Sequence, residues 1–150
     1  MRIVLQRVKK ASVKIDGKII SKIANGLLIF VGIEEADDME DIEWLTGKIS
    51  NMRIFDDQNG IMNLSVKEIN GDILAISQFT LHARVKKGNR PSYVDAAKPE
   101  ISIPLYKKFV NHLSAGLGKD IKTGEFGAEM HVSLINDGPV TINLDSKYRK

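Results

Sequence analysis

Two short pairs, Asp16-Gly17 and Asn25-Gly26, constrain the fold of this chain more than any other feature. They stand between consecutive apolar runs at residues 12–15, 18–24 and 27–33. Asp-Gly and Asn-Gly favour two-residue β-hairpins, because both central residues of a type I′ turn need φ > 0. With one more apolar run at residues 3–8, the first 33 residues are expected to form an antiparallel meander.

Two later segments predict amphipathic helices. In the first, Asp37-Asp38 precedes apolar residues at steps of three and four, namely Met39, Ile42, Leu45, Ile49 and Met52. In the second, the helical row Leu105, Phe109 and Leu113 runs toward glycines 116 and 118. Pro104 is expected in the first turn of this helix, with Ser102 as its N-cap.

The remaining apolar patterns indicate strands. Residues 53–63 predict a short hairpin, and Asp72 to Phe79 is apolar enough for a central strand. Residues 130–134 and 140–144 alternate in polarity and predict two strands that meet at Asp137-Gly138-Pro139. The expected fold is α/β or α+β: a strongly curved, mainly antiparallel sheet or partial β-barrel packed with two helices, in one domain spanning residues 1–150.

Composition excludes several kinds of chemistry. The chain has no cysteine, and its three histidines, at positions 82, 112 and 131, have no metal-ligand spacing. No Walker loop, dinucleotide fingerprint or Gly-x-Ser-x-Gly elbow occurs. We therefore expect no metal, no cofactor and no side-chain triad. The lack of a signal-peptide pattern or a membrane-length apolar run favours a cytoplasmic protein.

A cluster of polar residues ends the expected central strand. It consists of Ser77, Gln78 and Thr80 around Phe79, with backbone amides leaving regular pairing. Such amides can stabilise an oxyanion or hold a carbonyl or phosphate group. The alternative is a polar cap on a strand, in which case Phe79 belongs to the core.

Two other segments are candidates for recognition. Gly138-Pro139 combines a residue of wide conformational range with one that lacks a backbone donor, which suits a site that reads its ligand through main-chain atoms. The loop from His82 to Ala97 carries clustered charge, and the net charge of +3 is compatible with a polyanionic partner. Its basic residues are Arg84, Lys86, Lys87 and Arg90. A solvated loop without a partner is the alternative for that cluster.

These motifs together resemble the D-aminoacyl-tRNA deacylase family along nearly the whole chain. The resemblance rests on five motifs in the family's order: Gln6-Arg7-Val8, Ser77-Gln78-Phe79-Thr80-Leu81, Gly88-Asn89-Arg90-Pro91-Ser92-Tyr93 with Ala96-Ala97, Thr123-Gly124 with Phe126-Gly127-Ala128-Glu129-Met130, and Asn136-Asp137-Gly138-Pro139-Val140-Thr141. It implies an ester hydrolase that releases D-amino acids from mischarged tRNA and also acts on glycyl-tRNA.

The resemblance also implies roles for particular residues. Gly138-Pro139 matches a Gly-cisPro motif that one subunit of a homodimer inserts into the active site of the other, where main-chain carbonyls exclude L side chains. Arg7 matches an arginine that orients this motif, and Met130 a residue close to the substrate. Amides near Ser77 to Phe79 would stabilise the oxyanion while a ribose 2′-OH assists water. The remaining roles are substrate positioning by Gln78 and Thr80, and phosphate contacts by Arg84, Lys86, Lys87 and Arg90.

Two other function classes stay open at this point. The basic loop also fits an RNA-binding module without catalysis, although an aromatic content of 6% offers few platforms for base stacking. A small-molecule ester or amide hydrolase is the second alternative, favoured if the loop is solvated surface.

Overall fold

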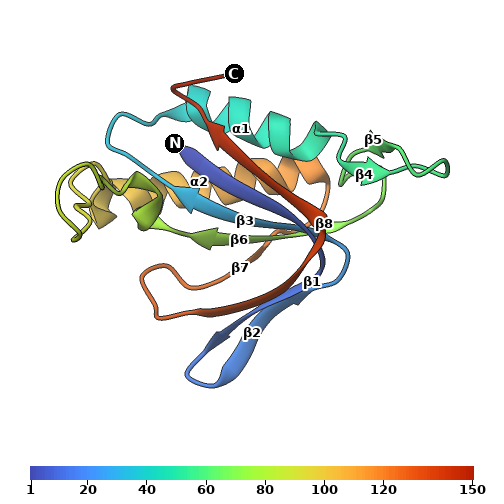
Figure 1. The fold of residues 1–150 in the computed structure, drawn as a ribbon, viewed down its shortest axis with the longest axis horizontal. Coiled ribbons are helices and arrows are strands. Elements are labelled where there is room, and N and C mark those ends of the chain that lie inside the picture. Colours follow the sequence, from blue (N-terminus) through green and yellow to red (C-terminus); the bar gives the residue numbers. More distant parts are fainter.

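A computed structural model describes all of residues 1–150 and shows a curved sheet with two helices on one face (Figure 1). The elements follow in the order β1 (Arg2–Ile15), β2 (Lys18–Ile23), β3 (Gly26–Gly32), α1 (Met39–Asn51), β4 (Phe55–Asp56), β5 (Met62–Leu64), β6 (Asp72–Ser77), the 3₁₀ helix η1 (Phe79–His82), α2 (Pro99–Leu117), β7 (Lys122–Thr123) and β8 (His131–Asp145). Neither α-helix is long and apolar enough to cross a membrane.

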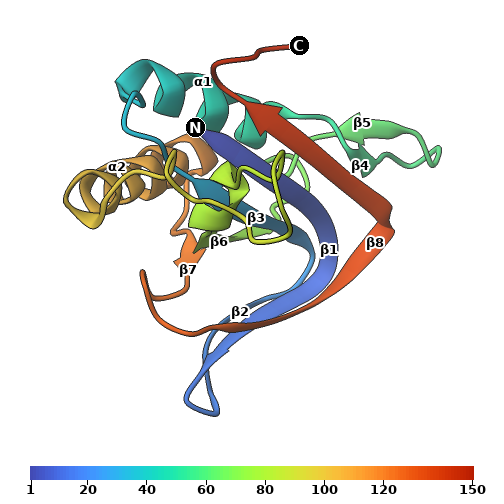
Figure 2. The same ribbon diagram turned by 60° about the vertical axis from the view of Figure 1, so that its left-hand side comes forward.

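The main sheet has six strands and is mixed. Its order is β2-β1-β3-β6-β7, and β8 pairs with β1 only. Strand β1 runs antiparallel to β2, β3 and β8, whereas the pairs β3–β6 and β6–β7 are parallel. Figure 2 shows β1 and β8 bending together, so that the sheet curls into a nearly closed barrel. The expected α+β fold with a curved sheet and two helices is confirmed.

Only one of the two hairpins at the N-terminus forms. Asp16 and Gly17 have φ of +48° and +78°, as a type I′ turn requires. Asn25 and Gly26 have no positive φ, and β2 and β3 both pair with β1 instead of with each other. The predicted meander is wrong at this step, because β1 is one continuous strand of 14 residues that offers successive stretches to β3 and β2.

Gly26 serves a different purpose from the one expected. A Cβ built on it would overlap the carbonyl oxygen of Asp72, the first residue of β6. Gly26 and Asp72 are also partners in the parallel register of β3 and β6. The glycine is therefore required by the close approach of two central strands and not by a turn.

The two strands expected at the C-terminal end are one strand. β8 runs for 15 residues alongside β1, and its register is irregular where Gln6 pairs with Thr141 and Val8 pairs with Asn136. Residues 137–140 therefore all face the single residue Arg7 and form a bulge instead of a turn between strands. The Gly138-Pro139 bond within this bulge is cis.

Capping residues and proline set where the two helices begin. Asp38 caps α1, accepting from the amide of Glu40, and the side chain of Asp41 accepts from the amide of Asp38. Helix α2 begins at Pro99, so the expected start at Ser102 and Pro104 is wrong. A proline at the first helical position loses no hydrogen bond, which makes Pro99 a good start. Pro104 lies inside the helix, and Gly118 ends it with φ of +81°.

Both faces of the central strands are buried. In β3 and β6, Ile29 and Ala75 belong to the cluster under the helices, whereas Leu28, Leu74 and Ile76 belong to a second cluster inside the curled half of the sheet. Burial on both faces explains the continuous apolar runs of these strands. It also fixes the C-terminal end of β6, from which the Ser77–Thr80 segment emerges.

Candidate active site

The Ser77–Thr80 segment leaves the sheet with two unpaired amides. The amide of Gln78 still donates to the carbonyl of Val31 at 2.8 Å, as the last bond beyond β6. Phe79 and Thr80 are the first two residues of η1, so their backbone N–H groups have no acceptor within that helix. Neither N–H group donates a hydrogen bond to any other backbone carbonyl. The free donors are therefore those of Phe79 and Thr80, one step further along the chain than expected.

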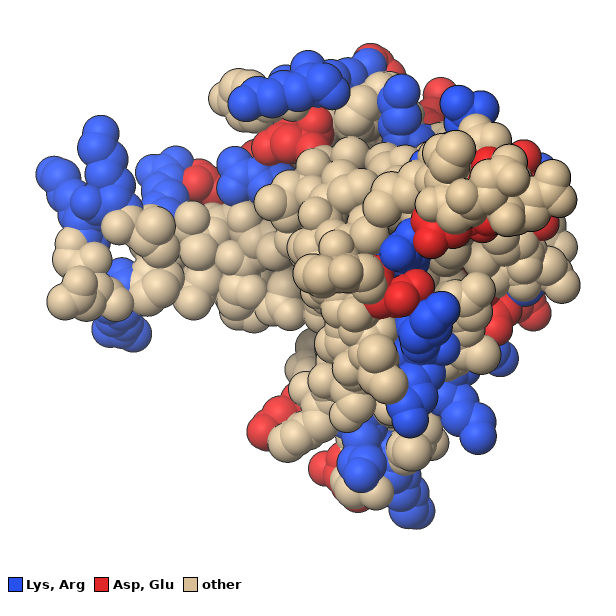
Figure 3. Space-filling view, turned by 45° about the vertical axis from the view of Figure 1, so that its right-hand side comes forward, with Lys and Arg blue, Asp and Glu red and all other residues tan.

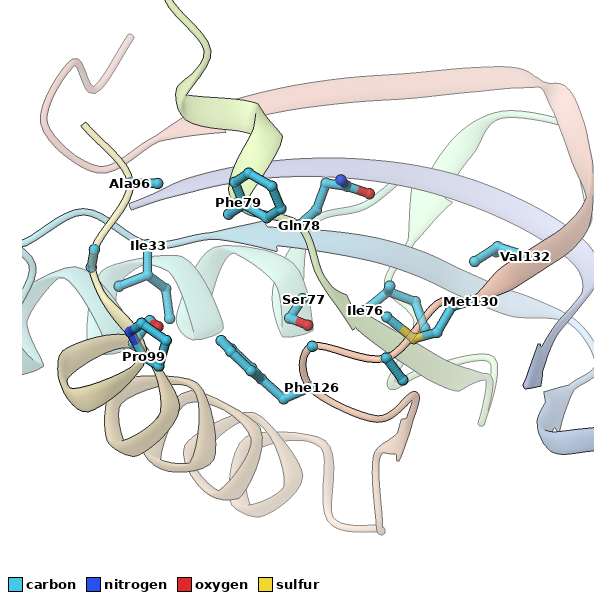
Figure 4. A pocket seen from close by; sticks show the side chains of 14 residues that line it. Ile33, Ile76, Ser77, Gln78, Phe79, Ala96, Pro99, Phe126, Met130 and Val132 are labelled. Atoms are coloured by element: carbon cyan, nitrogen blue, oxygen red, sulfur yellow. The ribbon is translucent and has the colours of Figure 1, made fainter. Parts of the chain in front are cut away.

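A pocket of about 500 Å³ lies beside this segment. Figure 4 shows Ser77 near its middle, with Phe126 and Pro99 toward one side and Met130 and Val132 toward the other. Its complete lining is Ile33, Ile76, Ser77, Gln78, Phe79, Ala96, Ala97, Pro99, Ser102, Phe126, Gly127, Ala128, Met130 and Val132. A mainly apolar cavity with a few convergent polar groups is typical of a small-ligand site.

The side chains of the segment are held by short contacts. The amide group of Gln78 donates to the hydroxyl of Thr80 at 2.6 Å, and Thr80 itself does not line the pocket. Phe79 is 56% exposed and packs edge-on against Tyr93, with ring centroids 5.1 Å apart. The alternative in which Phe79 belongs to the core is therefore wrong.

Met130 reaches the pocket because Gly124 makes room for it. A Cβ on Gly124 would collide with the sulfur of Met130. The segment 124–130 connects β7 to β8, and its residues Phe126 and Met130 line the pocket on either side of Ser77 (Figure 4). The structure thus brings Met130 together with Ser77, Gln78 and Phe79 in the lining of one pocket.

Arg7 holds the bulge of β8. Its side chain is 7% exposed, and its Nε donates to the carbonyl of Asp137 at 3.1 Å while Nη1 donates to the carbonyl of Ile54 at 2.7 Å. Carboxylates of Asp56 and Asp137 each lie 3.4 Å from the guanidinium. A buried cation with this many acceptors fixes the geometry of what it contacts.

Gly138 and Pro139 lie apart from the pocket of their own chain. Both are exposed, and neither lines the pocket beside Ser77. Figures 1 and 2 place the bend of β8 across the molecule from the C-terminal end of β6. One chain therefore presents the pocket and the Gly138-Pro139 step as two separate surfaces.

The basic loop is only partly free. The guanidinium of Arg84 forms a two-pronged ion pair with Asp95, and this hydrogen bond holds the pKa of Asp95 below its ordinary value. Lys86, Lys87 and Arg90 have no ion-pair partner in the structure, and basic side chains gather on the protruding loop in Figure 3. Arg84 therefore closes the loop, whereas the other three remain available.

Sequence reasoning missed several lining residues. Ser102, expected as an N-cap, lies inside α2 with its hydroxyl donating to the Lys98 carbonyl at 3.1 Å, and it lines the pocket with Pro99. The sequence pattern does not predict that Pro99 and Ser102 line the pocket, because they reach it only through the start of α2 at Pro99. His82, also unassigned, is 1% exposed and neither ring nitrogen has a hydrogen-bond partner.

The fold and the site together define an α+β protein with a mainly apolar pocket that Ser77 and Gln78 line, beside a segment with two unpaired main-chain amides. The model of the family described as D-Tyr-tRNA(Tyr) deacylase matches residues 4–145. The chain belongs to this family.

Similar proteins agree with this assignment over their full length. D-aminoacyl-tRNA deacylases of Flavobacterium psychrophilum and Bacteroides fragilis are 63% and 65% identical over 150 residues, with 100% of both chains covered. Among solved structures, the c-Myc DNA Unwinding Element Binding Protein is 40% identical with a TM-score of 0.91, covering 97% of this chain and 98% of that one. The similarity therefore includes both motifs of the candidate site.

Proposed function

We propose that this protein is a D-aminoacyl-tRNA deacylase, with residues 1–150 as one catalytic domain. It hydrolyses the ester that joins a D-amino acid, or glycine, to the terminal ribose of tRNA, and it releases the free amino acid and tRNA. The observation that carries this proposal is the pocket beside Ser77, with unpaired amides at Phe79 and Thr80. The names of relatives that are 63–65% identical supply the substrate class.

The chemistry follows from what the pocket offers. No histidine or lysine lines it, so a hydroxyl of the chain has no base to activate it. Water attacks the ester carbonyl carbon, assisted by the neighbouring ribose hydroxyl, and the developing oxyanion accepts hydrogen bonds from the free amides. The bond from the carbonyl carbon to the ribose oxygen then breaks, and that oxygen takes a proton. The side chains of Gln78 and Thr80, which form a hydrogen bond with each other, position the substrate amine and sugar.

Discrimination between D and L substrates is assigned to Gly138-Pro139 of a second subunit. The support is structural: the step is exposed, fixed by Arg7 and absent from the pocket of its own chain. Inserted into the partner's pocket, its carbonyl groups would collide with an L side chain and leave space for a D side chain. Such a reader contacts only the backbone shared by all amino acids.

The basic loop contributes contacts to phosphate near the acceptor end. Lys86, Lys87 and Arg90 carry this role because their charges are unpaired, and Arg84 contributes less because Asp95 neutralises it. These contacts add affinity that falls with salt and carries no sequence information.

A deacylation assay tests the proposed activity. Purified protein is expected to release D-tyrosine from D-Tyr-tRNA, in the presence of a chelator, while L-Tyr-tRNA stays intact. Binding of the tRNA without release would support the non-catalytic RNA-binding module. Faster hydrolysis of free amino-acid esters than of D-Tyr-tRNA would support the small-molecule hydrolase.

A mixing experiment tests the shared site. Gly138→Ala impairs the inserted step, and Ala128→Trp fills the pocket, so each homodimer is expected to be inactive or slow. Random reassembly of the two gives heterodimers with one intact site, and about a quarter of wild-type activity should return. No recovery, although mixed dimers are present by native mass spectrometry, contradicts sharing across subunits.

A further inference from the structure

A second basic surface lies on the curled half of the sheet. Lys10, Ser12 and Lys14 alternate along β1 and therefore project from the same face. In the register, Ser12 pairs with Lys22 of β2 and with Ser133 of β8, so these side chains share that face. We call Lys10, Lys14 and Lys22 the lysine face.

The polar groups of the lysine face have no partners within the chain. Lys10, Lys14 and Lys22 are exposed and make neither an ion pair nor a side-chain hydrogen bond, in contrast to Lys9, which lies 3.4 Å from Asp137. A shallow groove of about 320 Å³ crosses this face without any carboxylate in its lining. It is lined by Lys10, Ala11, Ser12, Ile19, Lys22, Ile23, Ser133, Leu134 and Ile135.

The lysine face lies directly behind one wall of the pocket. Strand β8 alternates, so that Val132 points inward to line the pocket while His131 and Ser133 are exposed on the opposite face. His131 pairs with Lys14 in the register. Because β8 pairs with no strand other than β1, nothing in the sheet separates the pocket from this outer face along the free edge of β8. Figure 3 shows basic side chains running down this lower part of the molecule, apart from those of the protruding loop.

We propose that the lysine face binds phosphates of the acceptor stem of a tRNA whose 3′ end occupies the pocket. The inference rests on the proposed function, since it assumes that an aminoacyl ester on RNA enters the pocket. Lys10 and Lys14 stand four residues apart on one strand, about 13 Å, so that their side chains can contact different, non-adjacent phosphates of the stem. The hydroxyls of Ser12 and Ser133 provide neutral donors between them.

Charge favours RNA over a second copy of the chain on this face. A symmetric contact would bring two identical lysine faces together, with no carboxylate in the groove to separate the like charges. RNA supplies the opposite charge along its whole length, and it releases counterions when lysines neutralise it.

Salt-dependent kinetics with two substrates test the proposal. The triple variant Lys10→Gln, Lys14→Gln, Lys22→Gln is compared with the wild type on D-Tyr-tRNA and on the D-tyrosyl ester of adenosine, which has no stem. The matched control removes three exposed lysines without ion pairs elsewhere, Lys67→Gln, Lys107→Gln and Lys108→Gln.

The lysine face predicts a specific pattern. On D-Tyr-tRNA the triple variant should lose about tenfold in kcat/KM through KM. The slope of log(kcat/KM) against log[salt] should flatten by about 3, for three lost contacts to the phosphates of a duplex stem. The adenosine ester should be hydrolysed at the wild-type rate, and the matched control should keep most activity on both substrates.

Other results would overturn the proposal. Equal loss in the matched control shows a net-charge effect, and equal loss on the adenosine ester shows damage to the pocket. An unchanged rate on D-Tyr-tRNA, or a change in oligomeric mass alone, also removes the lysine face as an RNA surface. If the wild type hydrolyses neither substrate, the proposed function fails. Direct binding of uncharged tRNA by the two triple variants then still decides the role of the lysine face.

Discussion

Gly138→Ala is the substitution that most directly tests how the main chain of the β8 bulge works. Gly138 has φ of +122°, a conformation that costs an L residue about 1–3 kcal/mol. A Cβ there would lie 2.9 Å from Nη2 of Arg7 and 3.0 Å from Cγ2 of Val140. Arg7 cannot yield freely, because Nη1 is bonded to the carbonyl of Ile54 at 2.7 Å. The bulge itself must therefore shift.

The shift has a size that kinetics can detect. If the cost of about 1–3 kcal/mol appears in the positioning of the inserted step, kcat/KM on D-Tyr-tRNA falls about 5- to 150-fold. Thr80→Ala removes one hydroxyl that accepts from Gln78, worth about 0.5–1.5 kcal/mol. Gly138→Ala is therefore expected to lose more activity, or more D/L discrimination, than Thr80→Ala.

Single-turnover deacylation of D-Tyr-tRNA and L-Tyr-tRNA, together with thermal unfolding, measures both effects. Gly60→Ala is the matched control, since Gly60 has φ of +74° with no atom within 4 Å of the added Cβ. It should lower stability by about 1 kcal/mol and leave deacylation unchanged. A Gly138→Ala enzyme with wild-type rates and wild-type discrimination would refute the role given to this step.

Three further substitutions test the fold around the site. Arg7→Met should lower the free energy of unfolding by about 2–4 kcal/mol in urea, since the carbonyls of Ile54 and Asp137 lose a buried donor; a change below about 0.5 kcal/mol contradicts this. Gly26→Ala should lower the free energy of unfolding by at least about 3 kcal/mol, because the added Cβ forces β3 away from β6. Gly47→Ala, on the exposed surface of α1, should raise the free energy of unfolding slightly. Similar changes for both variants would contradict the close approach of Gly26 to Asp72. Burial raises the pKa of Asp41, but hydrogen bonds from Lys147, Ser146 and the Asp38 amide lower it further, to about 2. The ionised Asp41 carboxylate therefore stabilises the fold above pH ~4, and this stabilisation is lost as the pH falls toward 2. Between pH 5 and pH 2 the free energy of unfolding of the wild type should fall by about 2 kcal/mol more than that of Asp41→Asn. Parallel plots of unfolding free energy against pH for the two proteins would contradict this.

Local signals predicted the elements of the fold better than their pairing. Asp16-Gly17 formed the expected turn because its neighbours on both sides pair with each other. Asn25-Gly26 carried the same signal and did not, since strand β1 between β2 and β3 takes both as partners. The strand pairing depends on the length of β1. The polar residues Lys9 and Lys10 divide the apolar pattern of β1 into two short runs, so the sequence does not show that it is one strand.

The sequence predicted those residues of the candidate site that lie within its recognisable motifs. Ser77, Gln78, Phe79 and Met130 line one pocket, whereas Thr80 lies outside its lining. Pro99 and Ser102 enter it through the early start of α2, which no periodic pattern in their neighbourhood marks. The lysine face was also missed, because Lys10, Lys14 and Lys22 lie on two strands and become one surface only through their register.

The position of β8 at an open edge of the sheet has a consequence for solubility. A strand of 15 residues paired on one side leaves a row of free N–H and C=O groups, which is a template for pairing with other chains. The bulge at residues 137–140 interrupts that row, and Pro139 has no N–H to offer. What remains are two short segments of free edge, and the one beside Lys10 and Lys14 repels strands of like charge. The irregular step assigned to recognition thus also protects the folded protein against edge-to-edge aggregation.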